Sequence, residues 1–120
     1  MMRARSIGLW MIGLSVAVAA TPVAAADLAG AKRSFDMFCT KCHGPAGKGD
    51  GSAAATLATK PRDLTECARM KDVTDDTLFR AIKEGGESVS LSKDMPAWKD
   101  GMEDDEIHAL VVYVRSLCKH

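Results

Sequence analysis

The spacing of apolar residues predicts three helices in this chain. Apolar side chains recur three and four positions apart over residues 28–40, 74–84 and 104–117, so each segment would present one apolar face. Asp27 and Thr74 stand at the start of the first two segments and are suitable N-caps. We therefore expect an all-α domain.

The stretch between the first two helices has no helical periodicity. Residues 44–51 read Gly-Pro-Ala-Gly-Lys-Gly-Asp-Gly, a dense set of turn formers, and an alanine-rich segment follows. Glycine-rich loops also bind phosphate, but neither usual sequence pattern for phosphate binding is present. We interpret residues 44–65 as a loop, and we expect Gly85 and Gly86 to end the second helix.

The beginning of the chain has the features of an export signal. An apolar run follows Arg3 and Arg5, and Ala26 closes a run of small residues that a signal peptidase accepts. We expect a signal peptide over residues 1–26 and one small domain over residues 27–120, located in the bacterial periplasm. The alternative is an uncleaved membrane anchor, because the uncharged stretch approaches the ~20 residues that span a bilayer.

Charge and composition exclude some classes of function. Without the two leader arginines, the chain has 14 basic and 16 acidic residues, so it lacks the basic excess of a nucleic-acid binder. Its large apolar side chains are few, and domains of this size often need a cofactor or cross-link to be stable. We expect the chain to fold poorly without such a group.

The residues Cys39, Cys42 and His43 form the pattern C-x-x-C-H. This spacing is typical of covalent haem c attachment, with the thiols bonded to the porphyrin and the imidazole bound to the iron. A thioredoxin-like site would need a βαβ context, and a zinc site would need two further ligands, whereas Cys67 and Cys118 are single and distant. Haem attachment is the interpretation that we adopt.

Met95 is our candidate for the second axial ligand of the iron. It lies between the second and third predicted helices, far enough from His43 to reach the opposite face of a haem, and Pro96 stiffens the backbone beside it. Histidine and methionine together favour the ferrous state and leave no open position for oxygen or peroxide, which indicates an electron carrier rather than an enzyme.

The remaining methionines and histidines are less suited as ligands. Met37 is too close to the attachment motif, and Met70 is equally suited to filling the core. Met102 is expected to pack against the last helix as a hydrophobic staple. His108 lies outside the apolar face of that helix and His120 is terminal.

These motifs, in this order, resemble a class I cytochrome c. The resemblance implies a small fold in which the N- and C-terminal helices cross beside one covalently bound haem, with Ala31, Phe35 and Tyr113 at the crossing. The family usually has glycine where this chain has Ala31, so the contact would widen or move to Gly30. The family also uses a proline carbonyl to orient the proximal imidazole; Pro61 is our best match, and another loop carbonyl between Gly51 and Pro61 is the alternative.

Cys67 and Cys118 are left as an even pair. In an oxidising compartment we expect a disulfide between them, with two free thiols as the alternative.

The main hypothesis is a monohaem carrier of single electrons between a donor and an acceptor protein. Lys41, Lys48, Lys93 and Lys99 would frame the exposed haem edge and attract acidic partners, with ordinary solvated lysines as the alternative. The alternatives are a haem enzyme or gas-binding protein with an open distal site, and a fixed electron-transfer subunit of a larger oxidoreductase.

Overall fold

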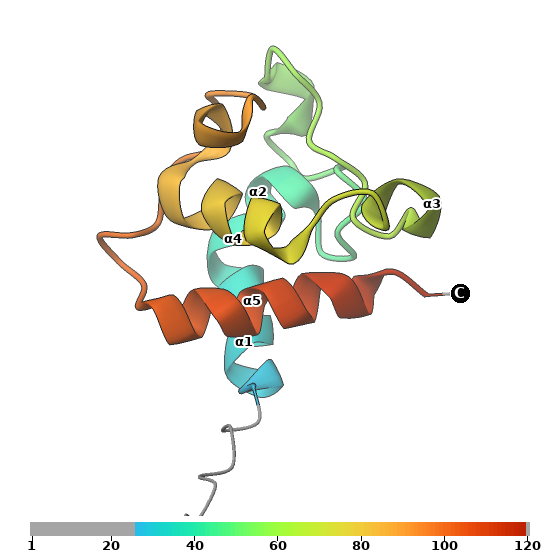
Figure 1. Ribbon diagram of the computed structural model, residues 1–120. Helices are drawn as coiled ribbons and strands as arrows, with labels where there is room; N and C mark the ends of the chain where they lie inside the picture. Colours follow the sequence, from blue (N-terminus) through green and yellow to red (C-terminus); the bar gives the residue numbers. More distant parts are fainter. Residues whose placement is uncertain (1–25, 120) are drawn as a thin grey trace, which may run out of the picture.

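The computed structural model describes residues 26–119, so nearly all of the predicted signal peptide lies outside it. The α-helices are α1 (Leu28–Ser34), α2 (Thr40–His43), α3 (Cys67–Met70), α4 (Asp75–Glu84) and α5 (Asp104–Leu117). A π-helical segment, η1 (Phe35–Cys39), joins α1 to α2, and two 3₁₀ turns are η2 (Ala54–Thr56) and η3 (Gly86–Val89). The described part contains helices and loops without a strand, which confirms the all-α prediction (Figure 1). Its helices are all too short or too polar to cross a bilayer.

The first helix continues three residues beyond the predicted end and includes a wider turn. Asp27 caps it, because its carboxylate accepts from Gly30 N at 2.8 Å. In η1 the Thr40 N–H donates to the carbonyl of Phe35, five residues earlier, which is the bonding of a π turn. The wider turn rotates the cysteine motif relative to the face of α1 that carries Ala31.

Helix α5 lies across α1, as the family resemblance implied (Figure 1). The rings of Phe35 and Tyr113 meet at 5.3 Å between centroids, and Ala31 is 4% exposed. The crossing therefore accommodates the alanine methyl group. A side chain at Gly30 would collide with the capping carboxylate, because a Cβ there would lie 2.1 Å from Oδ2 of Asp27, the oxygen beside the capping Oδ1.

The start of α5 is fixed by polar and apolar contacts. Glu103 and Glu106 form a capping box, in which each side chain accepts from the backbone N–H of the other residue. Met102 precedes this box and is buried in the same cluster as Ile107, as the staple prediction required. The acidic residues at the start of α5 thus cap the helix and complement the positive end of its dipole.

Helix α4 also begins and ends where the sequence indicated. Thr74 accepts from Thr77 N at 3.1 Å, and Gly85 follows the last turn with φ +88°. On its outer side, Phe79 stacks on the exposed ring of His108 with 4.3 Å between centroids. His108 therefore lies on the surface of the α4–α5 contact, away from any ligand position.

Candidate functional site

A cleft of about 900 Å³ brings together the residues that the sequence singled out. Cys39, Cys42 and His43 line it from the end of the first helix, and Met95 lines it from the loop after α4. Cavities that hold cofactors and drug-sized ligands are typically about 300–1,000 Å³. The cleft therefore has room for a group of that size beside the imidazole and the thioether.

The glycine-rich loop completes the helix that carries the cysteines. The backbone N–H groups of Gly49, Gly51 and Ala53 donate to the carbonyls of His43, Cys42 and Lys41, at 2.8, 3.1 and 2.9 Å. These are carbonyls that a helix end leaves without partners. A Cβ on Gly51 would lie 2.3 Å from the Lys41 carbonyl oxygen, so the close return of the loop needs glycine there.

The His43 side chain is half-buried in the cleft, with its Nδ1 atom fully buried. Burial lowers its pKa, and the Arg62 backbone raises it by a smaller amount. Nδ1 is buried and makes no hydrogen bond of normal geometry, so Arg62 approaches the ring without a well-formed bond. Pro61, our best match for the orienting carbonyl, makes no hydrogen bond to Nδ1 either. The Pro61 carbonyl oxygen lies close to Gly49, where a Cβ would be 2.3 Å from it. A neutral imidazole is the form that binds a metal.

Both thiols of the motif are free and partly exposed. Burial, and secondly the proximity of Cys42, raise the pKa of Cys39 to about 11, so this thiol is protonated at neutral pH. The two sulfurs stay unpaired although the chain forms a disulfide elsewhere. They are therefore available for bonding to another group in the cleft.

The loop that carries Met95 is attached to the end of α4. The Met95 carbonyl accepts from Gly86 N at 3.0 Å, and Trp98 N donates to the Ile82 carbonyl at 3.0 Å. A Cβ on Gly86 would lie 2.2 Å from the Ser92 carbonyl oxygen and 3.2 Å from the Met95 Cβ. Gly86 therefore does more than end the helix, a role that the sequence analysis did not identify.

Met95 is the one methionine of the described residues that lines the cleft. Met70 and Met102 are buried in the core, 1% and 8% exposed, and Met37 lies on the surface, 72% exposed. Trp98 lines the cleft beside Met95, with its ring 5.3 Å from that of Phe38.

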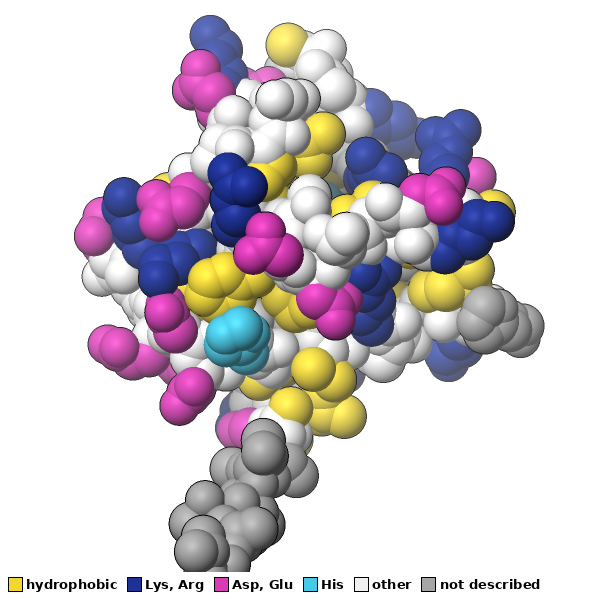
Figure 2. Space-filling model, in the orientation of Figure 1, with side chains coloured by type: hydrophobic (Ala, Val, Ile, Leu, Met, Phe, Trp, Pro, Cys, Tyr) yellow, Lys and Arg dark blue, Asp and Glu magenta, His cyan; other side chains and the backbone are white. Residues whose placement is uncertain are grey.

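The rim of the cleft differs from the expected ring of lysines. Of the predicted four, Lys41 and Lys48 line the cleft, whereas Lys99 pairs with Glu84 at 3.0 Å. Lys93 is exposed and is not among the lining residues. Further basic side chains line the cleft from the segment before α4, where the sequence offered no periodicity to place them: Lys60 and Arg62 in the loop, and Arg69 in α3. Figure 2 shows Lys and Arg side chains gathered toward the upper right of the molecule.

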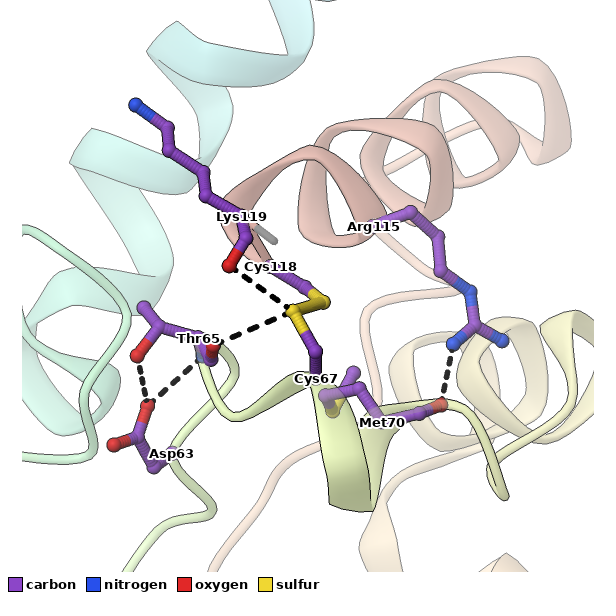
Figure 3. The surroundings of a disulfide bond; sticks show 7 residues. All are labelled: Asp63, Thr65, Cys67, Met70, Arg115, Cys118 and Lys119. Atoms are coloured by element: carbon purple, nitrogen blue, oxygen red, sulfur yellow. Dashed lines mark hydrogen bonds between the residues drawn. A yellow bond between two sulfur atoms is a disulfide. The ribbon is translucent and has the colours of Figure 1, made fainter.

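The predicted disulfide between Cys67 and Cys118 is present, with its Cα atoms 5.1 Å apart (Figure 3). It joins the start of α3 to the residue after α5. A zinc site that includes these two cysteines is excluded, because their sulfurs are bonded to each other. Beside the disulfide, Arg115 reaches from α5 to the backbone of Met70, a contact that sequence reasoning missed.

The residues around the cleft fit a covalently attached haem. Two free thiols are spaced on one helix, the adjacent imidazole has an unpartnered Nδ1, and a thioether lines the same cleft from the loop after α4. The lining also contains the apolar side chains needed against a porphyrin, among them Phe38, Leu57, Leu91 and Trp98.

Comparison with known proteins gives one family for most of the chain. The family model described as "Cytochrome C oxidase, cbb3-type, subunit III" matches residues 26–114. The cbb3-type cytochrome c oxidase subunit FixP of Bradyrhizobium diazoefficiens is 31% identical over 91 residues, which are 76% of this chain. The matched chain spans 28% of the length of that relative.

Two solved structures share the fold. The KustC0563 c-type cytochrome superimposes with a TM-score of 0.61 at 22% identity, over 74% of this chain and 98% of that one. A chain of the Kuenenia stuttgartiensis reducing HAO-like protein complex Kustc0457/Kustc0458 superimposes with a TM-score of 0.59 at 24% identity, over 77% of this chain and 44% of that one. At these identities the likeness supports the fold class.

Proposed function

Because the chain belongs to the cbb3-type cytochrome c oxidase subunit III family of c-type cytochromes, we propose that it carries single electrons through one covalently bound haem c. Cys39 and Cys42 would hold the haem by thioether bonds. His43 and Met95 would be the two axial ligands. When bound, the haem supplies an iron centre that alternates between the ferric and ferrous states.

The observation that carries this proposal is the meeting of Met95 with the cysteine motif in one cleft. A thioether ligand raises the reduction potential relative to a second imidazole. With both axial positions filled by the protein, no position would be open for a substrate. The arrangement therefore favours electron transfer over catalysis at the iron.

The residues of the chain have defined tasks in this function. Burial keeps the His43 imidazole neutral and excludes water from its Nδ1 side. The bonds from the glycine loop hold the helix end in place, and Gly86 fixes the Met95 carbonyl. Basic side chains at the cleft would steer acidic redox partners toward it by long-range attraction, which weakens as salt increases.

The experiment that tests the ligands compares wild type with Met95→Ala. Wild-type holoprotein should be low-spin in the ferric state and should show a sulfur-to-iron charge-transfer band. The variant should retain covalent haem, lose that band and have a lower midpoint potential. Met102→Leu is the matched control, since Met102 is buried in the core and away from the cleft. Unchanged spectra in Met95→Ala would contradict the assignment.

The same spectra separate the proposal from a haem enzyme or gas-binding protein. An open distal site predicts a high-spin wild-type ferric form that binds cyanide rapidly and a ferrous form that binds carbon monoxide rapidly. A saturated low-spin iron predicts slow or no binding.

A second candidate function is a fixed electron-transfer subunit of a larger oxidoreductase. It is favoured by the likeness to FixP, whose printed name makes it an oxidase subunit. Purification from native membranes and periplasm discriminates the two, because a fixed subunit co-purifies with a partner at constant ratio. The same material tests the periplasmic location, since cleavage after Ala26 would leave Asp27 as the first residue.

A further inference from the structure

Helix α3 is fastened to the C-terminal end of α5 at both of its ends (Figure 3). Its first residue, Cys67, is bonded to Cys118. The carbonyl of its last residue, Met70, accepts from Arg115 Nη1 at 2.6 Å. A helix of four residues is too short to be stable alone, so these two links maintain it.

Arg115 extends the attachment from α3 to the start of α4. Its Nε donates to Asp75 Oδ1 at 2.7 Å, and its Nη2 donates to the carbonyl of Val73. The planar guanidinium thus binds two backbone carbonyls and one carboxylate, which an ammonium group could not do with the same geometry. The side chain is 30% exposed, so solvent screens these contacts only in part.

The residues just before α3 form one wall of the cleft. Pro61, Arg62, Asp63 and Glu66 all line it, and Arg69 within α3 does so too. Arg62 is the residue whose backbone acts on the pKa of His43. We call residues 61–70 the cleft wall. Buried Leu64 connects it to the glycine loop, since Leu64 N donates to the Gly47 carbonyl at 2.7 Å.

The same end of α5 also supports the helix that leads to His43. Tyr113 packs on Phe35 of the first helix, and Arg115 follows Tyr113 by two residues. The C-terminal part of α5 thus contacts both the helix that carries His43 and the cleft wall. Their separation depends on the links that α5 makes to each.

We propose that Arg115 and the Cys67–Cys118 disulfide are positioning groups that hold the cleft wall against the His43 imidazole. This inference rests on the proposed function, because it assigns the links a task at the proximal ligand. Loss of the links frees the wall to move away from the ring, which changes the orientation and solvation of the imidazole. The cross-link therefore affects the iron site as well as the overall stability.

The test uses ferric holoprotein of wild type and of the Cys67→Ser/Cys118→Ser double variant. Hydrogen exchange of the backbone amides of residues 62–70 should be at least ~10-fold faster in the variant, because local opening becomes easier. The hyperfine-shifted proton resonances of the axial imidazole should move. Arg115→Lys keeps the charge but not the guanidinium geometry, and it should show both effects to a smaller degree.

Lys83→Met is the matched control. It removes the 2.8 Å ion pair with Asp104 between α4 and α5, a link to α5 that does not involve the cleft wall. It should leave both readouts as in wild type. If the double variant fails to fold, the wild-type holoprotein can be reduced at the disulfide, alkylated and then reoxidised at the iron.

The outcomes separate this inference from the proposed function. The inference alone would be overturned if the wild type binds haem and the protein without the disulfide has the same imidazole resonances and the same amide exchange rates as the wild type. A wild-type chain that attaches no haem would overturn the proposed function, and the inference with it.

Discussion

The two sides of the cleft are built in different ways. The side with Cys39, Cys42 and His43 is formed by one continuous stretch, in which a helix end receives hydrogen bonds from the loop that follows it. The side with Met95 is a loop attached to the end of α4, a helix that in turn packs on α5. The first side is thus local in sequence, whereas the second requires helices that are already in place. Changes at the two sides should therefore have different consequences.

The largest expected effect comes from removing the thiols. Cys39→Ala/Cys42→Ala should abolish covalent haem attachment, because no other free cysteine is present among the described residues. Mass spectrometry of the denatured protein measures this directly. Cys67→Ser/Cys118→Ser removes the same number of sulfurs and should retain the haem. Haem that stays bound to the first variant after denaturation would contradict the attachment site.

The same haem-free variant tests how far the stability of the fold depends on bound haem. A domain of this size buries little apolar surface, and a cleft of about 900 Å³ leaves its apolar walls in water. We expect circular dichroism in increasing urea to show a broad, weakly cooperative transition. A sharp transition with native helix content would show that the polypeptide is stable without haem.

Two glycines permit a matched test of the two sides. Ala at Gly51 would place a Cβ 2.3 Å from a carbonyl oxygen at the attachment helix, and Ala at Gly86 would place one 2.2 Å from a carbonyl oxygen beside Met95. Each should cost about 1–3 kcal/mol of unfolding free energy through overpacking. Gly51→Ala should lower the yield of holoprotein. Gly86→Ala should retain covalent haem but lose part of the sulfur-to-iron charge-transfer band.

Gly101→Ala is the control for both glycine variants. A Cβ there meets its nearest atom at 3.9 Å, which is an ordinary contact. It should change neither the holoprotein yield nor the spectrum. Equal spectral changes in Gly51→Ala and Gly86→Ala would contradict the division of the cleft into two independently built sides.

The same division explains what the sequence could predict. Helices α4 and α5 begin and end as expected, because Thr74, Gly85 and the acidic run at residue 103 act through neighbouring backbone groups. The disulfide was predictable from the even cysteine count in a chain that we expected to be exported. The grouping of Met95 with the attachment motif was predicted from its place between two helices and its distance from His43 along the chain, while its role as a ligand stays a prediction.

What the sequence could not predict depends on contacts between distant segments. Arg115 binds backbone carbonyls, and carbonyls are present at every residue, so no sequence pattern identifies its partners. The approach of Gly86 to Ser92 depends on the path of a loop without periodicity. The π turn at residues 35–39 lies in a segment whose apolar spacing suits an ordinary helix.

The smallest expected effect is a pH dependence of the unfolding free energy that arises from Asp63 in the cleft wall. Its carboxylate accepts from the hydroxyl and the backbone N–H of Thr65, at 2.6 and 2.9 Å, and these bonds hold the pKa of Asp63 below its usual range. A lowered folded-state pKa means that the unfolded chain takes up the proton first as pH falls. The stabilisation is therefore complete above about pH 4 and is lost as the pH falls through the lowered pKa.

Asp63→Asn should be less stable than wild type at pH 7, and the difference in urea midpoint should shrink toward pH 3. Thr65→Ala should remove part of the same dependence, and a constant difference from pH 7 to pH 3 would exclude the carboxylate as its source.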